Sequence, residues 1–314
     1  MRRVLIAAAL ALAGCDVVVD VPPPIRQGVV TPQDLPAFFD CLREQSATVV
    51  AAHRGGPAPG FAENAIPTFQ NTVTLGLDPV FLEIDIARTR DGALVLMHDD
   101  DLDRTTTGSG PVSAHTLREI QALRLEDDDG QVLNAHPPTL REALDWAEGR
   151  AVLELDVKRG VAYEDVIAEV RAAGAENRVV FITYSTDAAV RVHRLAPALM
   201  ISASIESERD LDDLERRGVD LTRVLAWTGI EEPNSALNIA LAARGVEAMF
   251  GTLGNPDTSW DGRFERQGRD EYATFADTGL QLISTDRPNA ASRDLDANDG
   301  DADGFAALQC VAAR

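Results

Sequence analysis

Strand-like and helix-like segments alternate along most of this chain, and this alternation limits the folds available to it. Short runs of apolar and β-branched residues are followed by segments with apolar residues at helical spacing, from about residue 48 to residue 288. No linker-like stretch interrupts this region, and a domain of roughly 250 residues is typical of one (β/α)8 barrel. The pattern predicts a single α/β domain, which is either a TIM-type barrel or an open doubly wound sheet.

Nine segments are predicted to be strands, one more than such a barrel uses. They are residues 48–52, 80–86, 93–97, 151–158, 179–183, 199–203, 224–227, 246–250 and 280–284. The run at 224–227 is short, and we expect it to be the one outside the barrel.

Polar side chains gather where the first four of these strand segments end. They are His53, Arg54, Glu83, Asp85, His98, Glu154, Asp156 and Lys158. The C-terminal ends of parallel barrel strands converge on one face, where active sites are built, so this clustering favours the barrel over the open sheet.

Two carboxylates, Glu83 and Asp85, lie two residues apart and therefore on one face of an apolar strand. Unpaired buried charges are strongly disfavoured, so a bound cation is expected to compensate them. Oxygen ligands suit Ca²⁺ or Mg²⁺, and one such ion is the cofactor that we predict. Lys158 is the only lysine in a chain whose other long basic side chains are all arginines, which indicates a need for a compact point charge at that position.

Residues 100–138 break the alternation. This stretch is polar, contains glycine and proline, and includes one predicted short helix at 116–123. Loops of this length are usually functional or disordered. We interpret it as an ordered insertion after the third strand of a domain that spans residues 47–290.

The N-terminus resembles a bacterial lipoprotein signal. Two arginines precede an apolar run at residues 4–13 that is too short to span a bilayer, and Leu12-Ala13-Gly14-Cys15 follows. This resemblance implies a signal peptide at 1–14 and lipidation of Cys15, with residues 15–46 forming a tether and the start of the domain. The protein is then expected to be exported and anchored by lipid to a bacterial membrane, facing the periplasm.

The other two cysteines, Cys41 and Cys310, lie near opposite ends of the domain. Export permits a disulfide between them, and two buried free thiols are the alternative. The region 291–314 is predicted to be an acidic tail. Residues 299–304 begin like an EF-hand loop, but Cys310 stands where the motif requires glutamate. A solvated acidic turn is therefore preferred to an incomplete calcium loop.

The net charge of −22 argues against nucleic acid as a partner, because its binding depends on a basic surface.

A series of motifs in fixed order is similar to the glycerophosphodiester phosphodiesterase family. They are HRG at 53–55, EN at 63–64, LEIDI at 82–86, TRDG at 89–92, VLMHD at 95–99, LDRTT at 102–106, PTL at 138–140 and STDRP at 284–288. Several ordered motifs are far more specific than any single one. The resemblance implies a TIM barrel whose insertion helps to enclose the glycerol end of a small-molecule glycerophosphodiester.

The resemblance also implies roles for individual residues. His53 and His98 match a pair that serves as general base and general acid, and which one does which stays open. Glu83 and Asp85 match metal ligands, and Arg54 matches a phosphate-binding arginine, which Lys158 is expected to assist.

The fourth strand departs from the family pattern. The family usually has Glu-x-Lys there, whereas this chain has Glu154-Leu155-Asp156-Val157-Lys158. Alignment on the lysine makes Asp156 the third metal ligand, as in the related spider-venom type phospholipases D, with Glu154 as the fallback. A second departure is Ala65, where the family usually has threonine.

The expected reaction is metal-dependent hydrolysis of glycerophosphodiesters to sn-glycerol 3-phosphate and an alcohol. The alternatives are a phospholipase D-like enzyme acting on lysophospholipids or sphingomyelin, favoured by the lipid anchor and Asp156, and a noncatalytic surface-binding lipoprotein. The remaining histidines, His115, His136 and His193, are expected to be surface or structural residues.

Overall fold

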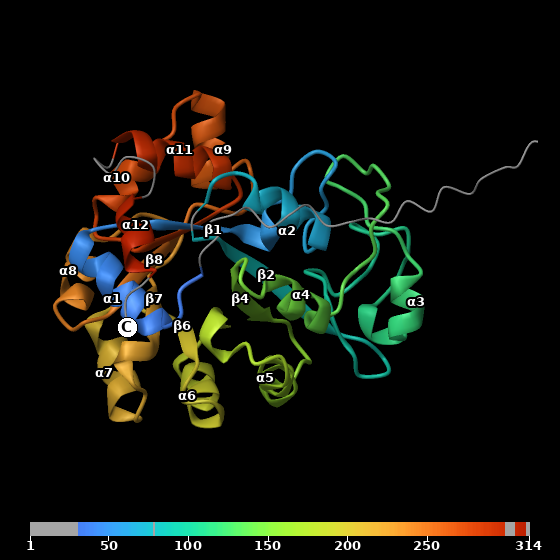
Figure 1. The fold of residues 1–314 in the computed structure, drawn as a ribbon, viewed down its shortest axis with the longest axis horizontal. Helices are drawn as coiled ribbons and strands as arrows, with labels where there is room; N and C mark the ends of the chain where they lie inside the picture. Colours follow the sequence, from blue (N-terminus) through green and yellow to red (C-terminus); the bar gives the residue numbers. More distant parts are fainter. Residues whose placement is uncertain (1–30, 78, 299–304, 312–314) are drawn as a thin grey trace, which may run out of the picture.

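A parallel β-barrel forms the centre of the protein, as the computed structural model of residues 31–77, 79–298 and 305–311 shows (Figure 1). The described residues form a nine-stranded sheet in which only β3 is antiparallel, which leaves eight parallel strands. These are β1 (Val49–Ala52), β2 (Phe81–Arg88), β4 (Val152–Val157), β5 (Val179–Thr183), β6 (Met200–Ser204), β7 (Val224–Trp227), β8 (Glu247–Gly251) and β9 (Leu282–Thr285). Since β1 pairs with both β2 and β9, the barrel is closed, and the predicted TIM barrel is confirmed.

The prediction of which strand lies outside the barrel was wrong. The short β7 pairs with β6 and β8 as a full barrel strand. The extra strand is β3 (Leu94–Leu96), which folds back antiparallel onto β2. The turn at residues 89–92 is the physical reason, because a parallel return requires a crossover of a dozen or more residues. His98 therefore follows a hairpin strand rather than a barrel strand.

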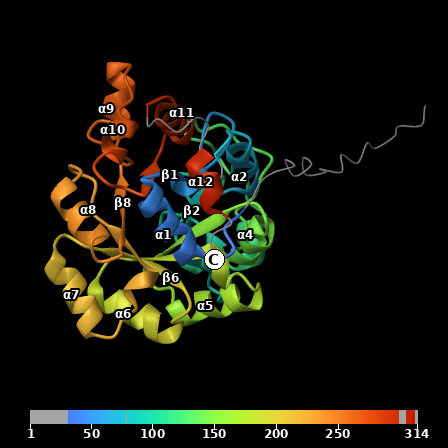
Figure 2. The same cartoon turned by 60° about the vertical axis from the view of Figure 1, so that its left-hand side comes forward.

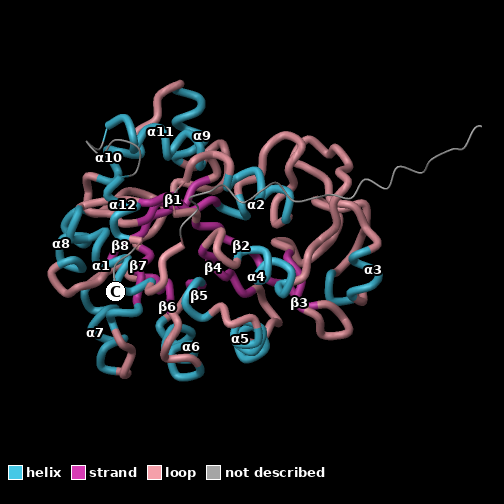
Figure 3. The backbone as a smooth tube through the Cα atoms, in the orientation of Figure 1, coloured by secondary structure: helices cyan, strands magenta, loops and turns pink. Residues whose placement is uncertain are grey.

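Helices surround the barrel and cover its strands (Figure 3). They are α2 (Ile66–Val73), α4 (Leu140–Ala147), α5 (Tyr163–Ala172), α6 (Thr186–Leu195), α7 (Glu208–Arg216), α8 (Ser235–Ala242), α9 (Trp260–Gln267), α10 (Tyr272–Ala276) and α11 (Pro288–Asn298). Their apolar faces pack against the outward side chains of the strands in one large core. Short 3-10 helices occur at His53–Gly55, Val112–Ala114, Glu176–Arg178 and Leu221–Arg223.

The N-terminal end of the barrel is closed by α1 (Leu35–Gln45). Its Phe38, Phe39 and Leu42 are fully buried against the apolar residues that begin the strands, including Phe81. The rings of Phe38 and Phe81 stack with centroids 5.9 Å apart. The barrel interior is therefore largely apolar at this end, with an exception in the buried Glu247 at the start of β8, which accepts from Arg43 of α1 at 2.7 Å.

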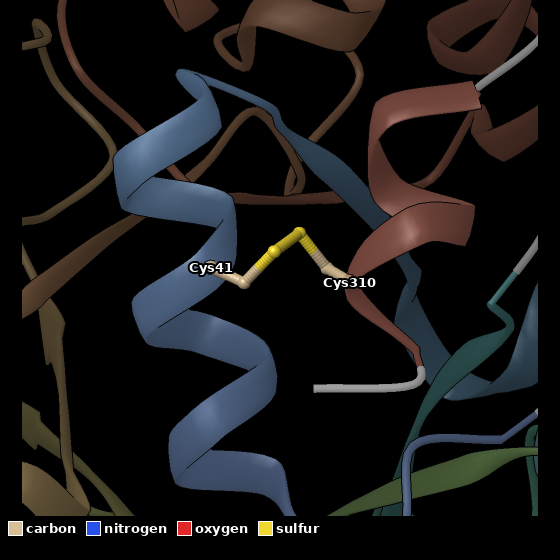
Figure 4. Close-up of a disulfide and its surroundings, with 2 residues drawn as sticks. All are labelled: Cys41 and Cys310. Carbon is tan, nitrogen blue, oxygen red and sulfur yellow. A yellow bond between two sulfur atoms is a disulfide. The ribbon is translucent and has the colours of Figure 1, made fainter. Parts of the chain in front are cut away.

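The C-terminal region contains two helices where an acidic tail was expected. Leu295 of α11 is buried against the barrel, and α12 (Phe305–Cys310) lies beside α1 (Figure 2). Cys41 of α1 and Cys310 of α12 form a disulfide, with Cα atoms 5.4 Å apart (Figure 4). Of the two alternatives for these cysteines, the structure contains the bond.

Several predicted features lie outside the described residues: the signal peptide at 1–14, Cys15, the tether up to residue 30, and the acidic loop at 299–304. Within the part of the chain that is described, no helix combines the length and apolar character needed to cross a bilayer.

The insertion at 100–138 is ordered and has its own small core. Leu102, Val112 and Ile120 pack with Val95 and Met97 of the β3 hairpin. The predicted short helix is α3 (Leu117–Gln121), which begins in a capping box formed by Thr116 and Glu119. A second cluster around Leu125 joins the insertion to the segment between β1 and α2. The insertion is thus fixed to the rim of the barrel.

Candidate active site

A cavity of ≈ 260 Å³ opens at the C-terminal ends of the barrel strands. One side is polar and brings together most of the residues singled out in the sequence: His53, Glu83, Asp85, His98, Glu154, Asp156 and Lys158. The other side is formed by Ile182, Tyr184, Trp227, Ile230, Met249 and Leu253. Residues on or just after each of the nine strands therefore meet at the position where TIM barrels carry their active sites.

Three carboxylates form the acidic centre of this cavity. Glu83, Asp85 and Asp156 each place one oxygen within 4.8 Å of the others. The parallel register that sets Asp85 beside Asp156 on β2 and β4 produces this grouping. The predicted ligand set is thus a cluster that could hold a metal ion.

The charge balance of the cluster indicates a demand for a cation. Burial, together with repulsion from Asp85 and Asp156, raises the pKa of Glu83 well above its ordinary value. Asp156 Oδ1 is buried and has no hydrogen-bond partner among the described residues. Lys158 Nζ lies 2.5 Å from Asp85 Oδ1 and 2.6 Å from Asp156 Oδ2, so one ammonium group contacts two of the three acidic side chains. A divalent cation fits this oxygen donor set.

Asp85 is held in place by Asn64. The Asn64 side chain donates to Asp85 Oδ2 at 2.6 Å and accepts from the Asp85 backbone N–H at 2.9 Å. Burial raises the pKa of Asp85, but the charge of Lys158 more than offsets this, so the pKa lies below its ordinary value. Asn64 adopts a left-handed backbone with φ 55°, which asparagine tolerates better than most residues. Its side chain therefore orients an ionised ligand.

His53 is oriented by a carboxylate from the last strand end. Its Nδ1 lies 2.6 Å from Asp286 Oδ1, and its Nε2 lies 3.9 Å from Glu83 Oε2. The Gly254 backbone N–H fixes the second oxygen of Asp286 at 2.8 Å. Burial raises the pKa of Asp286, but the hydrogen bond with His53 outweighs it and the net shift is downward. An ionised Asp286 favours the proton on Nδ1 and leaves Nε2 facing the acidic centre.

His98 has the same arrangement on the opposite side. Its Nδ1 lies 2.7 Å from Asp99 Oδ1. The hydrogen bonds from Arg104, and then that of His98, lower the pKa of Asp99 to about 2. Both histidines thus have one ring nitrogen occupied by a carboxylate and the other available for proton transfer.

Arg54 contributes both its backbone and its side chain. Its backbone N–H donates to Glu83 Oε2 at 2.8 Å from a left-handed conformation with φ 51°. Its Nη1 donates to the buried Glu63 at 2.9 Å, while its Nε is buried with no partner among the described residues. Part of the Arg54 guanidinium is therefore uncommitted, as a role in binding an anion requires, although Arg54 is not among the residues that line the cavity.

Glu154 stands apart from the other carboxylates. It lies beside Glu83 in the register of β2 and β4 and is completely buried, and neither of its oxygens has a hydrogen-bond partner among the described residues. Burial raises its pKa to about 8, so it is mostly neutral at pH 7. The cluster that could hold a metal uses Asp156 instead.

Five residues that orient the site were not assigned from sequence: Glu63, Asn64, Asp99, Arg104 and Asp286. All five fall inside the motifs quoted above, so the signal was present, but their partners are set by the fold. His115 hydrogen-bonds the Pro111 carbonyl through Nδ1 at 2.9 Å, and the buried His193 accepts from the Asp220 backbone N–H at 3.3 Å. Neither these two nor His136 lines the cavity.

Comparison with known proteins agrees with this geometry. A sequence model described as the glycerophosphoryl diester phosphodiesterase family matches residues 53–290. A glycerophosphodiester phosphodiesterase of Caldanaerobacter subterraneus subsp. tengcongensis is 32% identical over 161 residues, which cover 49% of this chain. The match spans 65% of that relative, just under two thirds of its length.

Solved structures show the same fold. A glycerophosphoryl diester phosphodiesterase from Parabacteroides distasonis superposes with a TM-score of 0.73 at 29% identity, covering 86% of this chain and 95% of that one. A phosphodiesterase from Oleispira antarctica, solved in complex with the product sn-glycerol-3-phosphate, superposes with a TM-score of 0.63 at 21% identity, covering 81% of this chain and 99% of that one. The family match extends over most of the barrel and includes both histidines and all three clustered carboxylates, so this chain belongs to the glycerophosphoryl diester phosphodiesterase family.

Proposed function

We propose that this protein is a metal-dependent enzyme that hydrolyses glycerophosphodiesters to sn-glycerol 3-phosphate and an alcohol. One observation carries the proposal: His53 and His98, each with Nδ1 on a carboxylate, line the same cavity as a cluster of three acidic side chains. Membership of the family supports the reaction class. The product that we assign is the one present in the Oleispira antarctica structure.

Glu83, Asp85 and Asp156 would hold one divalent cation, Ca²⁺ or Mg²⁺. When bound, this ion supplies positive charge that polarises the phosphodiester and stabilises the extra negative charge of its transition state.

The side chains of the chain itself supply binding and proton transfer. The uncommitted part of the Arg54 guanidinium binds a phosphate oxygen, and Lys158 adds positive charge beside it. Nε2 of one histidine accepts a proton from the attacking oxygen as the new P–O bond forms. Nε2 of the other donates a proton to the alcohol oxygen as the old P–O bond breaks.

Hydrolysis of glycerophosphocholine, followed through release of sn-glycerol 3-phosphate, tests the proposal. We expect activity that is abolished by exhaustive chelation, restored by Ca²⁺ or Mg²⁺, and lost in His53→Ala and His98→Ala. Unchanged hydrolysis after chelation would remove the metal from the mechanism. If no divalent ion supports hydrolysis of any phosphodiester and His53→Ala leaves ligand binding intact, the protein is instead a noncatalytic surface-binding lipoprotein.

The apolar side of the cavity favours a second candidate, a phospholipase D-like activity on lysophospholipids or sphingomyelin. Tyr184 and Ile230 are 69% and 45% exposed beside Trp227. Gly251 makes room for the indole, because a Cβ there would stand 2.5 Å from the Trp227 ring. Product analysis with glycerophosphocholine, lysophosphatidylcholine and sphingomyelin as competing substrates separates the two candidates.

For the N-terminus we propose export and lipidation at Cys15, with the enzyme held at a bacterial membrane and facing the periplasm. The Leu12-Ala13-Gly14-Cys15 sequence supports this. Mass spectrometry of the mature N-terminus should show a diacylated cysteine, and Cys15→Ala should move the protein to the soluble fraction.

A further inference from the structure

Arg104 extends from the insertion to two carboxylates that serve different parts of the site. We infer that Arg104 is a positioning residue that fixes Arg54 and His98 relative to each other through Glu63 and Asp99. This inference rests on the proposed phosphodiesterase function and assigns the insertion a part in it. Neither carboxylate lines the cavity, so Arg104 acts through other residues rather than on the substrate.

The contact with Glu63 is a paired one. Arg104 donates from Nη1 to Oε2 at 2.9 Å and from Nη2 to Oε1 at 2.8 Å. The same Oε2 accepts from Arg54 Nη1 at 2.9 Å. The Glu63 side chain is only 4% exposed, so its charge depends on both arginines. Burial raises the pKa of Glu63, but the two arginines reverse this and leave it below its ordinary value. Removing Arg104 would leave Arg54 as the sole partner of a buried carboxylate.

The contact with Asp99 is also paired. Arg104 donates from Nε to Oδ2 at 2.6 Å and from Nη2 to Oδ1 at 3.1 Å. That Oδ1 is the atom facing His98 Nδ1 at 2.7 Å. Asp99 is about one third exposed, and without Arg104 its carboxylate would be free to rotate away from the histidine. Arg104 therefore determines the direction of the His98 ring through a single intermediate.

The geometry requires arginine. Its planar fork uses Nε, Nη1 and Nη2 to engage both carboxylates at once, and the compact ammonium of lysine cannot reproduce four donor contacts with two separate groups. Charges alternate along the chain of contacts from Arg54 through Glu63 and Arg104 to Asp99. Arg104 belongs to the insertion. The positions of Arg54 and His98 therefore depend on the folding of that segment.

The test compares Arg104→Gln and Arg104→Lys with Arg124→Gln, which removes the same charge from an exposed arginine of the same insertion. We expect kcat for glycerophosphocholine to fall roughly 100-fold in both Arg104 variants, which is the loss expected when a catalytic side chain is displaced by about 1 Å. The affinity for divalent ions should not change. Arg124→Gln should match the wild type. Guanidinium added to Arg104→Ala should restore part of the activity. Asp99→Asn should cost much less in the Arg104→Gln background than in the wild type.

A readout without turnover separates this inference from the proposed function. In ¹⁵N-histidine NMR spectra, the His98 Nδ1 signal should report a hydrogen-bonded N–H in the wild type and in Arg124→Gln, and should change in Arg104→Gln. A wild type inactive on every phosphodiester would refute the proposed function while this spectrum still tests Arg104. An unchanged His98 signal, or a kcat within threefold of an active wild type, would overturn the inference.

Discussion

Removing the Cys41–Cys310 disulfide should greatly lower the stability of the protein without changing its chemistry. The bond closes a loop with a sequence separation of 269 residues, which spans the whole barrel. The perturbation is the double variant Cys41→Ala/Cys310→Ala, compared with the oxidised wild type.

The magnitude follows from the loop length. Cross-linking residues this far apart lowers the chain entropy of the unfolded state. This raises the free energy of unfolding by at most about 5 to 6 kcal/mol at 25 °C. Total domain stabilities are typically about 5 to 15 kcal/mol, so this contribution is large. The buried Ala307 of α12 and Val311, which follows the helix, also pack at the end of the barrel near Phe38, and that contact weakens when α12 is no longer tied to α1.

Urea unfolding followed by circular dichroism measures the effect. We expect the double variant to lose several kcal/mol, and dithiothreitol to lower the wild type to the same level while leaving the variant unaffected. The bond lies at the opposite end of the barrel from the cavity, so kcat of the folded variant should equal that of the wild type. A loss below about 1 kcal/mol would refute the loop-entropy reasoning.

Three further predictions concern separate parts of the molecule. Asp286→Asn should lower kcat roughly 100-fold or more by removing the carboxylate that orients His53, measured by steady-state kinetics with metal affinity as the control. Burial raises the pKa of Glu247 to about 7 from 4.5. Protonated Glu247 therefore adds to the free energy of unfolding in full below pH 4.5, and this contribution is lost as pH rises to 7. Glu247→Gln should therefore gain up to about 3 kcal/mol relative to wild type across that window in urea unfolding, and a flat pH dependence would contradict this. Thr139→Ala removes half of the capping box with Glu142 at the start of α4 and should cost about 1 kcal/mol, seen as a lower Tm.

The sequence was sufficient to predict the barrel and the charged face, because strand periodicity and strand-end polarity are local properties. It failed at β3 and β7, where segments of similar composition take different places. The turn at residues 89–92 decides the direction of β3, and its length was the neglected signal.

The cavity residues were predictable for a related reason. Side-chain alternation places Glu83 and Asp85 on one strand face and Glu154 and Asp156 on another, and the family resemblance at Lys158 selected Asp156. The carboxylate that orients His53 was not predictable, because His53 and Asp286 are 233 positions apart and only barrel closure brings them together. No local pattern records a hydrogen bond between the first and last strands.

The β3 hairpin has a consequence for how this protein can diversify. Loops at the C-terminal end of TIM barrels can usually be replaced independently, which is how one fold acquires many substrates. Here the segment that follows β3 carries His98, Asp99 and Arg104 in one short stretch and continues directly into the insertion. Exchanging that loop with a relative would therefore transplant His98 and its carboxylate partner together with the insertion. New specificity is more readily acquired on the apolar wall around Ile230, which carries neither a histidine nor a carboxylate of the cavity.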